Sequence, residues 1–135
     1  MGTPEDILNK PGRLTPAEEA VVREHPVTGE RILTPIIRSR AVLAAIRGHH
    51  ERWDGGGYPD GLAGTGIPLA ARLFAVADAL DAMTTDRPYR RALPWELASE
   101  EIVRLAGSQF DPRVVEAFEA NAAELREIGR ALSAA

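Results

Sequence analysis

The fold of this chain is limited most by a glycine-rich stretch at residues 51–66, ERWDGGGYPDGLAGTG, which holds six of its twelve glycines. Glycine destabilises the interior of a helix or a strand, because its backbone loses the most conformational freedom on folding. The stretch therefore predicts a long irregular loop. Loops of this length inside a compact domain are usually functional or disordered.

Before this loop, the sequence predicts helices. Thr15 and Glu18 form a capping box at the start of the first helix, and Pro26 is expected to stop or bend it. A short helix is expected within residues 27–36, and a longer one within residues 37–50, which runs into two histidines. No stretch alternates between apolar and polar residues as a half-buried strand does.

After the loop, the pattern predicts three more helices, so the whole chain is expected to be all-α. The first spans residues 68–84 and is expected to bury an apolar stripe of five residues: Leu69, Leu73, Val76, Ala77 and Leu80. The second begins at Pro94 and ends near Gly107. Asp111 is placed to cap the last helix, which is expected to continue unbroken through residues 113–129.

The composition excludes several kinds of site and partner. There is no cysteine, which rules out disulfides and thiolate metal ligands. A net charge of −4 argues against general binding to DNA or RNA. The longest apolar run is broken by Arg72 and Asp78, so no membrane span is expected. The N-terminus lacks an apolar signal region, so the expected location is cytoplasmic.

Two adjacent histidines, His49 and His50, end the helix that precedes the loop. Successive residues of a helix project about 100° apart, but at a helix end both rings can turn toward one cavity. Neutral imidazole is the commonest metal ligand in proteins. An exposed, merely polar pair explains these two residues equally well when they are taken alone. The third histidine, His25, precedes a proline and is, taken alone, more typical of a structural residue.

Two acidic residues, Asp78 and Asp81, interrupt the most apolar predicted helix. A buried carboxylate is unfavourable unless it is paired or bound to a metal. Two solvated acids on an amphipathic helix are the alternative interpretation. Together with the histidines, an acid in this helix would complete a metal site made of nitrogen and oxygen ligands, and this is the interpretation we favour.

An arginine cluster, Arg87, Arg90 and Arg91, lies just beyond the end of the same helix in the turn TTDRPYRRAL. A guanidinium group binds phosphate through two parallel hydrogen bonds, and Tyr89 is available to stack on a base. The alternative is a solvated turn whose arginines offset the helix dipole.

These segments together resemble the HD-GYP domain family. The resemblance runs from about residue 2 to about residue 118 and covers five motifs in one order: PEDILNKPGRLT, EHPVTGERIL, the HHE and GYP loop, DRPYR and FDPRVVEAF. The family is an all-helical branch of the HD phosphohydrolases. Its members act in bacterial signalling as cyclic di-GMP phosphodiesterases and use divalent metal ions, commonly iron or manganese. The resemblance therefore implies an HD-domain-like helical bundle with hydrolase activity.

The resemblance also implies roles for individual residues. Four match the metal ligands of the family: His25, His49, His50 and Asp78. Three match the substrate side, with two arginines on phosphate and a tyrosine beside them: Arg87, Arg90 and Tyr89. The signature residues Gly57, Tyr58 and Pro59 are expected to shape the wall of the cleft. Three acids are expected to orient the ligands: Glu51, Asp54 and Asp81. No residue is assigned as catalytic.

The sequence departs from the family pattern at its beginning. The namesake His-Asp pair lies in a motif resembling HDIGK, which normally comes just before the segment matching MGTPEDIL. We therefore expect residues 1–135 to be the C-terminal portion of the domain, with little or no phosphodiesterase activity by itself. We also expect the chain to self-associate through an apolar face that the missing helices would cover. A cyclic dinucleotide and a signalling protein are the other expected partners.

Two further functions remain open from the sequence. One is a non-catalytic module that binds a cyclic dinucleotide or a partner protein in bacterial signalling. The other is a purely structural helical remnant, which would bind neither a metal nor a nucleotide.

Overall fold

The computed structural model describes residues 15–34 and 38–134, and within these ranges it contains α-helices and no strand. The all-α prediction is therefore confirmed. The helices are α2 (Pro16–Leu33), α3 (Arg40–Gly48), α4 (Leu69–Thr84), α5 (Trp95–Arg104), α6 (Pro112–Ala120) and α7 (Ala122–Ala134). A single 3₁₀ turn, Gly64–Gly66, lies in the glycine-rich loop.

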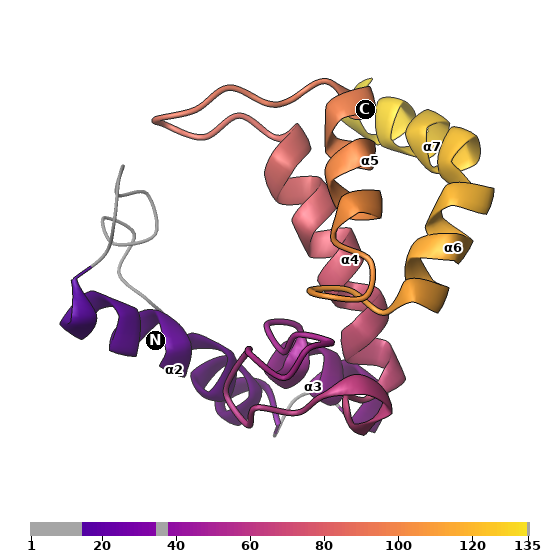
Figure 1. The fold of residues 1–135 in the computed structure, drawn as a ribbon. Helices are drawn as coiled ribbons and strands as arrows, with labels where there is room; N and C mark the ends of the chain where they lie inside the picture. The colour runs from indigo at the N-terminus through magenta and orange to yellow at the C-terminus, as the bar shows by residue number, and fades with distance from the viewer. Residues whose placement is uncertain (1–14, 35–37, 135) are drawn as a thin grey trace.

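Helix α4 is the centre of the arrangement (Figure 1). It contacts α3 on one side and α5 and α6 on the other, while α2 contacts α3. The glycine-rich loop lies beside α2 and α3 (Figure 1). The segment between α4 and α5 is a long loop that extends away from the helices (Figure 1). The arginine cluster lies in this loop.

Helix α2 begins as predicted but does not end where it was expected to end. The capping box is present, because the amide of Glu18 donates to Thr15 Oγ1 at 3.2 Å and the amide of Thr15 donates to Glu18 Oε1 at 2.9 Å. Of the two expected effects of Pro26, to stop or to bend the helix, the stop was wrong, and so was the separate short helix expected within residues 27–36, since α2 continues to Leu33. Proline removes one helical hydrogen bond, and here the ring of Pro26 is fully buried, which offsets part of that loss.

The main apolar core lies between α4, α5 and α6. Its buried members come from all three helices and from the α5–α6 connection: Val76, Ile102, Phe110, Val114, Val115 and Phe118. Smaller and partly buried apolar side chains pack around them, among them Ala79, Leu80 and Met83 of α4. The core therefore fixes the direction of α4, on which one of the predicted metal ligands lies.

The buried stripe predicted for α4 is only partly correct. Val76 is buried and Leu80 is partly buried, but Leu69 and Leu73 are 55% and 49% exposed, and Ala77 is exposed as well. Apolar residues lie on nearly all sides of α4, so the spacing of leucines could not tell which side faces the core. The fully buried side includes Ala71 instead, because small residues allow neighbouring helices to approach closely.

The C-terminal segment forms two helices rather than the single one expected. Helix α6 ends at Ala120, and the side-chain amide of Asn121 donates to the carbonyl of Ala117 at 2.8 Å. Asparagine competes in this way for backbone hydrogen bonds, which disfavours it in helix interiors. None of the described helices is long and apolar enough to cross a membrane.

Asp111 caps α6 as predicted and also joins α6 to α4. Its Oδ1 accepts from the amide of Arg113 at 2.9 Å, and its Oδ2 accepts from Arg72 Nη1 at 2.8 Å. Arg72 Nε donates to the carbonyl of Ile67 at 2.9 Å, at the end of the glycine-rich loop. Asp111 is only 3% exposed. The ion pair therefore links the loop, α4 and α6 at one buried point.

Candidate metal centre

A close contact between α3 and α4 sets the geometry of the site. A Cβ atom built on Gly48 would lie 2.9 Å from Cβ of Ala71, which is too close for any residue but glycine. The two helices therefore meet where α3 ends, and the two histidines follow directly. Asp78 lies seven residues after Ala71, about two helical turns further along a similar side of α4.

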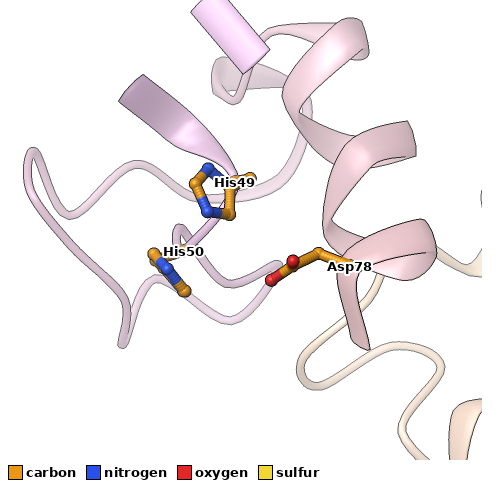
Figure 2. A group of neighbouring side chains, drawn as sticks. All are labelled: His49, His50 and Asp78. Atoms are coloured by element: carbon orange, nitrogen blue, oxygen red, sulfur yellow. The ribbon is translucent and has the colours of Figure 1, made fainter. Parts of the chain in front are cut away.

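His49, His50 and Asp78 come together at this junction. One ligand atom from each of the three residues lies within 4.8 Å of the others. Figure 2 shows both imidazole rings beside the end of α3, with the carboxylate of Asp78 reaching from α4 toward them. This spacing allows one ion to contact all three groups after small side-chain adjustments. The two imidazole rings come close together where the helix ends at Gly48.

The ring of His49 is oriented by the backbone of α3. Its Nδ1 lies 2.9 Å from the carbonyl oxygen of Ile46 and 3.1 Å from that of Ala45. Carbonyl oxygens only accept, so Nδ1 carries the proton and donates, which leaves Nε2 with a free lone pair. Metal-ligating histidines commonly have this arrangement, because the second nitrogen then fixes the ring and its tautomer.

The environment of His50 favours the neutral imidazole that binds metals. The pKa of His50 is lowered to about 4, mainly by burial and also by the nearby His49 and His25, against the opposing effect of Asp78. The ring stacks on Tyr58 with a centroid distance of 5.1 Å and packs against His49 at 4.1 Å. At neutral pH the ring is therefore unprotonated and available as a ligand.

The other predicted ligand and two of the expected orienting acids lie outside this trio. His25 is half-buried on α2 and is not one of the three residues whose ligand atoms converge, although its charge reaches His50. Asp54 pairs with Arg52 and accepts from the amide of Gly56 at 2.9 Å. Asp81 accepts a hydrogen bond from Thr85 Oγ1 at 3.3 Å.

The signature residues pack directly behind His50. A Cβ atom on Gly57 would lie 2.4 Å from the carbonyl oxygen of His50 and 2.5 Å from the amide nitrogen of Arg52. Only glycine permits this approach of the loop to the histidine backbone. The amide of Tyr58 donates to the same carbonyl at 3.3 Å. The loop therefore supports His50 from behind while the ring of Tyr58 covers one of its faces.

Glu51 holds the rest of the loop in place. Its side chain is 3% exposed, and its two oxygens accept from the amides of Asp60 at 2.8 Å and Leu62 at 3.0 Å. These two hydrogen bonds satisfy both oxygens of the buried side chain. Glu51 thus acts on the loop backbone next to the ligands, a more specific role than the sequence suggested.

Two sets of contacts that the sequence did not reveal also anchor the loop. The amides of Trp53 and Asp54 donate to carbonyls of the α5–α6 connection at 3.1 and 2.9 Å. Arg47 of α3 pairs with Asp60 of the loop and Glu30 of α2, both at 2.9 Å. These partners are far apart in the sequence and form no local motif, so nothing in the pattern pointed to them.

The arginine segment is exposed, and hydrogen bonds within it stabilise its turn. Arg87 and Arg90 exchange backbone hydrogen bonds across the turn at 2.7 and 3.1 Å, and Asp86 accepts from the amide of Ala92 at 2.7 Å. Arg90 Nη2 donates to the carbonyl of Ala82 at 2.9 Å. Ala82 is one turn beyond Asp78, which corresponds to about 6 Å along the helix axis. The side chain of Tyr89 is 47% exposed.

The donor set fits a divalent transition metal. Two imidazoles and one carboxylate are intermediate ligands that suit iron, manganese or zinc better than a hard ion such as calcium. Three protein ligands also leave coordination positions for water or a substrate oxygen. The site is therefore equipped to bind an ion and to present it to an anionic ligand.

Comparison with known proteins gives consistent results. Residues 1–114 match the model of the HD domain family. A cyclic di-GMP phosphodiesterase of Thermotoga maritima is 47% identical over 122 residues, which cover 87% of this chain and 33% of that protein. The cyclic di-GMP phosphodiesterase response regulator RpfG of Xanthomonas campestris is 43% identical over 132 residues, which cover 95% of this chain and 34% of the relative.

Relatives named for a different substrate are also similar. A 3'3'-cGAMP-specific phosphodiesterase of Vibrio cholerae is 39% identical over 123 residues, which cover 86% of this chain and 23% of that protein. The crystal structure of a cyclic GMP-AMP specific phosphodiesterase from the same organism has a TM-score of 0.64 at 24% identity, covering 95% of this chain and 32% of that one. That likeness shows the fold. The chain spans about a third or less of these relatives.

Replacing Glu51 by glutamine is expected to loosen the loop behind the metal ligands. Glutamine has the same size, but its NH₂ group replaces one of the two oxygens that accept from the backbone amides of Asp60 and Leu62. One of these amides would then face another donor, and an unsatisfied buried group costs about 1–3 kcal/mol. We expect lower thermal stability and faster hydrogen exchange at the amides of Asp60 and Leu62. The control is Glu116→Gln on the exposed side of α6. Equal exchange rates in both variants would contradict this role.

Proposed function

Because the chain belongs to the HD domain family, as a member of its HD-GYP group, we propose that it is the metal-binding portion of a cyclic dinucleotide phosphodiesterase. The observation that carries this proposal is the convergence of His49, His50 and Asp78. Cyclic di-GMP is the proposed substrate, supported by the names of two relatives, cyclic di-GMP phosphodiesterases that are 47% and 43% identical. The relative named for 3'3'-cGAMP makes that dinucleotide the second candidate.

The proposed cofactor is a divalent metal ion, either iron or manganese. The neutral His50 ring and the oriented His49 ring would supply nitrogen ligands, and Asp78 an oxygen ligand. Such an ion neutralises charge on a phosphate and lowers the pKa of bound water. His25 is proposed as a further ligand on the strength of the family motif, with its side chain on the neighbouring helix α2.

The arginine segment is proposed to hold the phosphate that reacts. Arg90 donates to the carbonyl of Ala82, which lies one turn beyond Asp78 on α4. Arg87 lies across the braced turn from it. Both side chains are exposed and can approach a bound anion, and two guanidinium groups satisfy phosphate oxygens through charge-assisted hydrogen bonds.

We expect slow or absent hydrolysis by the 135-residue chain alone. The described residues bring together one group of three ligands, which suits one ion. Phosphodiester cleavage in two-metal sites uses a pair of ions to stabilise both the attacking and the leaving oxygen. Binding of the dinucleotide is therefore a sharper test of the proposal than turnover.

Titration calorimetry with cyclic di-GMP in the presence of Mn²⁺ tests the proposed function. The Arg87→Ala variant is expected to bind about tenfold more weakly, because a hydrogen bond to a charged group contributes about 1.5–3 kcal/mol. The matched control is Arg91→Ala, an exposed arginine of the same segment, which is expected to bind as the parent does. EDTA is expected to weaken binding in all three proteins.

Two results would count against the proposal. One is an absence of binding to the parent protein with Mn²⁺ present. The other is an equal loss of affinity in the Arg87→Ala and Arg91→Ala variants, which would indicate a general charge effect rather than a phosphate contact.

We also propose that the chain self-associates through the exposed apolar side of α4. Leu69, Leu73 and Phe74 are 55%, 49% and 43% exposed on this helix, and Phe74 contacts the ring of His49. Contiguous apolar surface of this kind commonly marks an interface. Light scattering at high protein concentration is expected to show a dimer or larger species.

The Leu73→Glu variant is expected to shift the chain toward the monomer, because it places a charge in the buried interface. Ile128→Glu on α7 is the control, since Ile128 is similarly exposed at 54%. A monomeric parent chain at high concentration would overturn this proposal.

A further inference from the structure

A cavity lies near the metal centre, with Tyr58 in its wall. It has a volume of about 480 Å³, is open to solvent, and is lined by residues of α2 together with Tyr58 and Pro59. Cavities that bind small ligands typically have volumes of roughly 300–1,000 Å³. None of the three converging metal ligands lines it, so its contents would be held by other residues.

The cavity is rich in positive charge. Arg23 and Arg31 both line it, and Glu24 is its only acidic lining residue. Within the part of the chain that the structure describes, neither arginine has a carboxylate at ion-pair distance. The other arginine near this loop, Arg47, is by contrast paired with two acids. Two guanidinium groups without acidic partners attract an anion with oxygen acceptors.

The arginines line one cavity because α2 is continuous. Arg23 and Arg31 are eight residues apart, so on a regular helix their directions differ by about 80° and they lie about 12 Å apart along its axis. A break at Pro26 would have separated them in direction. Since α2 continues through this buried proline, both long side chains can reach an anion placed between them.

Tyr58 connects this cavity to the metal centre. The guanidinium carbon of Arg23 lies 5.4 Å from the centroid of the Tyr58 ring, and the ring of His50 stacks on Tyr58 at 5.1 Å with an interplanar angle of 19°. Arg23 and the proposed metal ligand His50 therefore both contact the ring of Tyr58. A ligand that reaches the ion and extends past Tyr58 would meet the arginines.

We propose that Arg23 and Arg31 bind the second, non-reacting phosphate of a cyclic dinucleotide, with the adjoining nucleoside against Tyr58 and Pro59. The inference rests on the proposed function for the identity of the ligand, because a cyclic dinucleotide carries two phosphates at fixed separation. One phosphate lies at the metal centre and the other in this cavity. The anion contact itself requires only the residues of α2, so it is testable without a metal.

The first experiment measures binding of 5′-GMP by NMR or calorimetry to protein kept in EDTA. Guanosine lacks the phosphate and inorganic phosphate lacks the nucleoside, so the three probes separate the two contacts. The parent protein is expected to bind 5′-GMP more tightly than guanosine, with an affinity that falls as salt screens the arginines. Binding of guanosine as tight as that of 5′-GMP would overturn the inference.

Three variants and one matched control give the expected pattern. Arg31→Ala and Arg23→Ala are each expected to weaken 5′-GMP binding about fivefold to tenfold, since each removes a charge-assisted contact. Glu24→Gln removes the one acid that lines the cavity and is expected to tighten binding about twofold to threefold by lowering repulsion. Arg113→Ala, on the exposed side of α6, is expected to have no effect. Circular dichroism verifies that each variant is folded.

The outcomes separate this inference from the proposed function. If Arg31→Ala and Arg113→Ala bind 5′-GMP equally well, the cavity contact is wrong, whether or not Mn²⁺ binds to the histidines. If the parent chain binds 5′-GMP as predicted but binds no Mn²⁺, the phosphate contact in the cavity is supported and the proposed metal site is contradicted. With both sites intact, Arg31→Ala is expected to weaken cyclic di-GMP binding while leaving the affinity for Mn²⁺ unchanged.

Discussion

The candidate site depends on the contact between Gly48 and Ala71. No side chain fits between α3 and α4 at this point, since a Cβ atom on Gly48 would lie 2.9 Å from that of Ala71, which is itself fully buried. The contact ends α3 directly beside α4, so the two following histidines face Asp78 two turns further on. The glycine-rich loop then folds back on the same histidines, because Gly57 allows its backbone to pass within contact of His50.

Much of the fold was predictable from local signals, and the errors have physical causes. Capping residues such as Thr15 and Asp111 act on neighbouring amides, so their roles were correct. The predicted stop at Pro26 was wrong because burial of its ring offsets part of the loss of a helical hydrogen bond. Leu69 and Leu73 were wrongly predicted to be buried because α4 is apolar on most sides. Which side becomes the core depends on α5 and α6, whose packing has no local pattern.

The candidate site was predictable to the extent that its residues form motifs. His49, His50 and Asp78 converge as expected, although 28 positions separate the last two in sequence. The supporting contacts of Arg47 and Arg72 join acids far along the chain, so no local pattern indicated them. The cavity lined by Arg23 and Arg31 was equally hidden, because α2 was expected from the sequence to stop or bend at Pro26, between the two arginines. The structure thus adds the groups that position the ligands and a second charged surface beside them.

The central claim is that His49, His50 and Asp78 hold a divalent ion, and Mn²⁺ binding measured by electron paramagnetic resonance tests it most directly. The parent chain is expected to bind Mn²⁺, and Asp78→Asn and His49→Ala are each expected to reduce the affinity at least about tenfold, because each removes a ligand. Asp81→Asn, on the same helix, is expected to bind as the parent does, since its carboxylate accepts from Thr85. Equal Mn²⁺ affinity in the Asp78→Asn and Asp81→Asn variants would contradict the account.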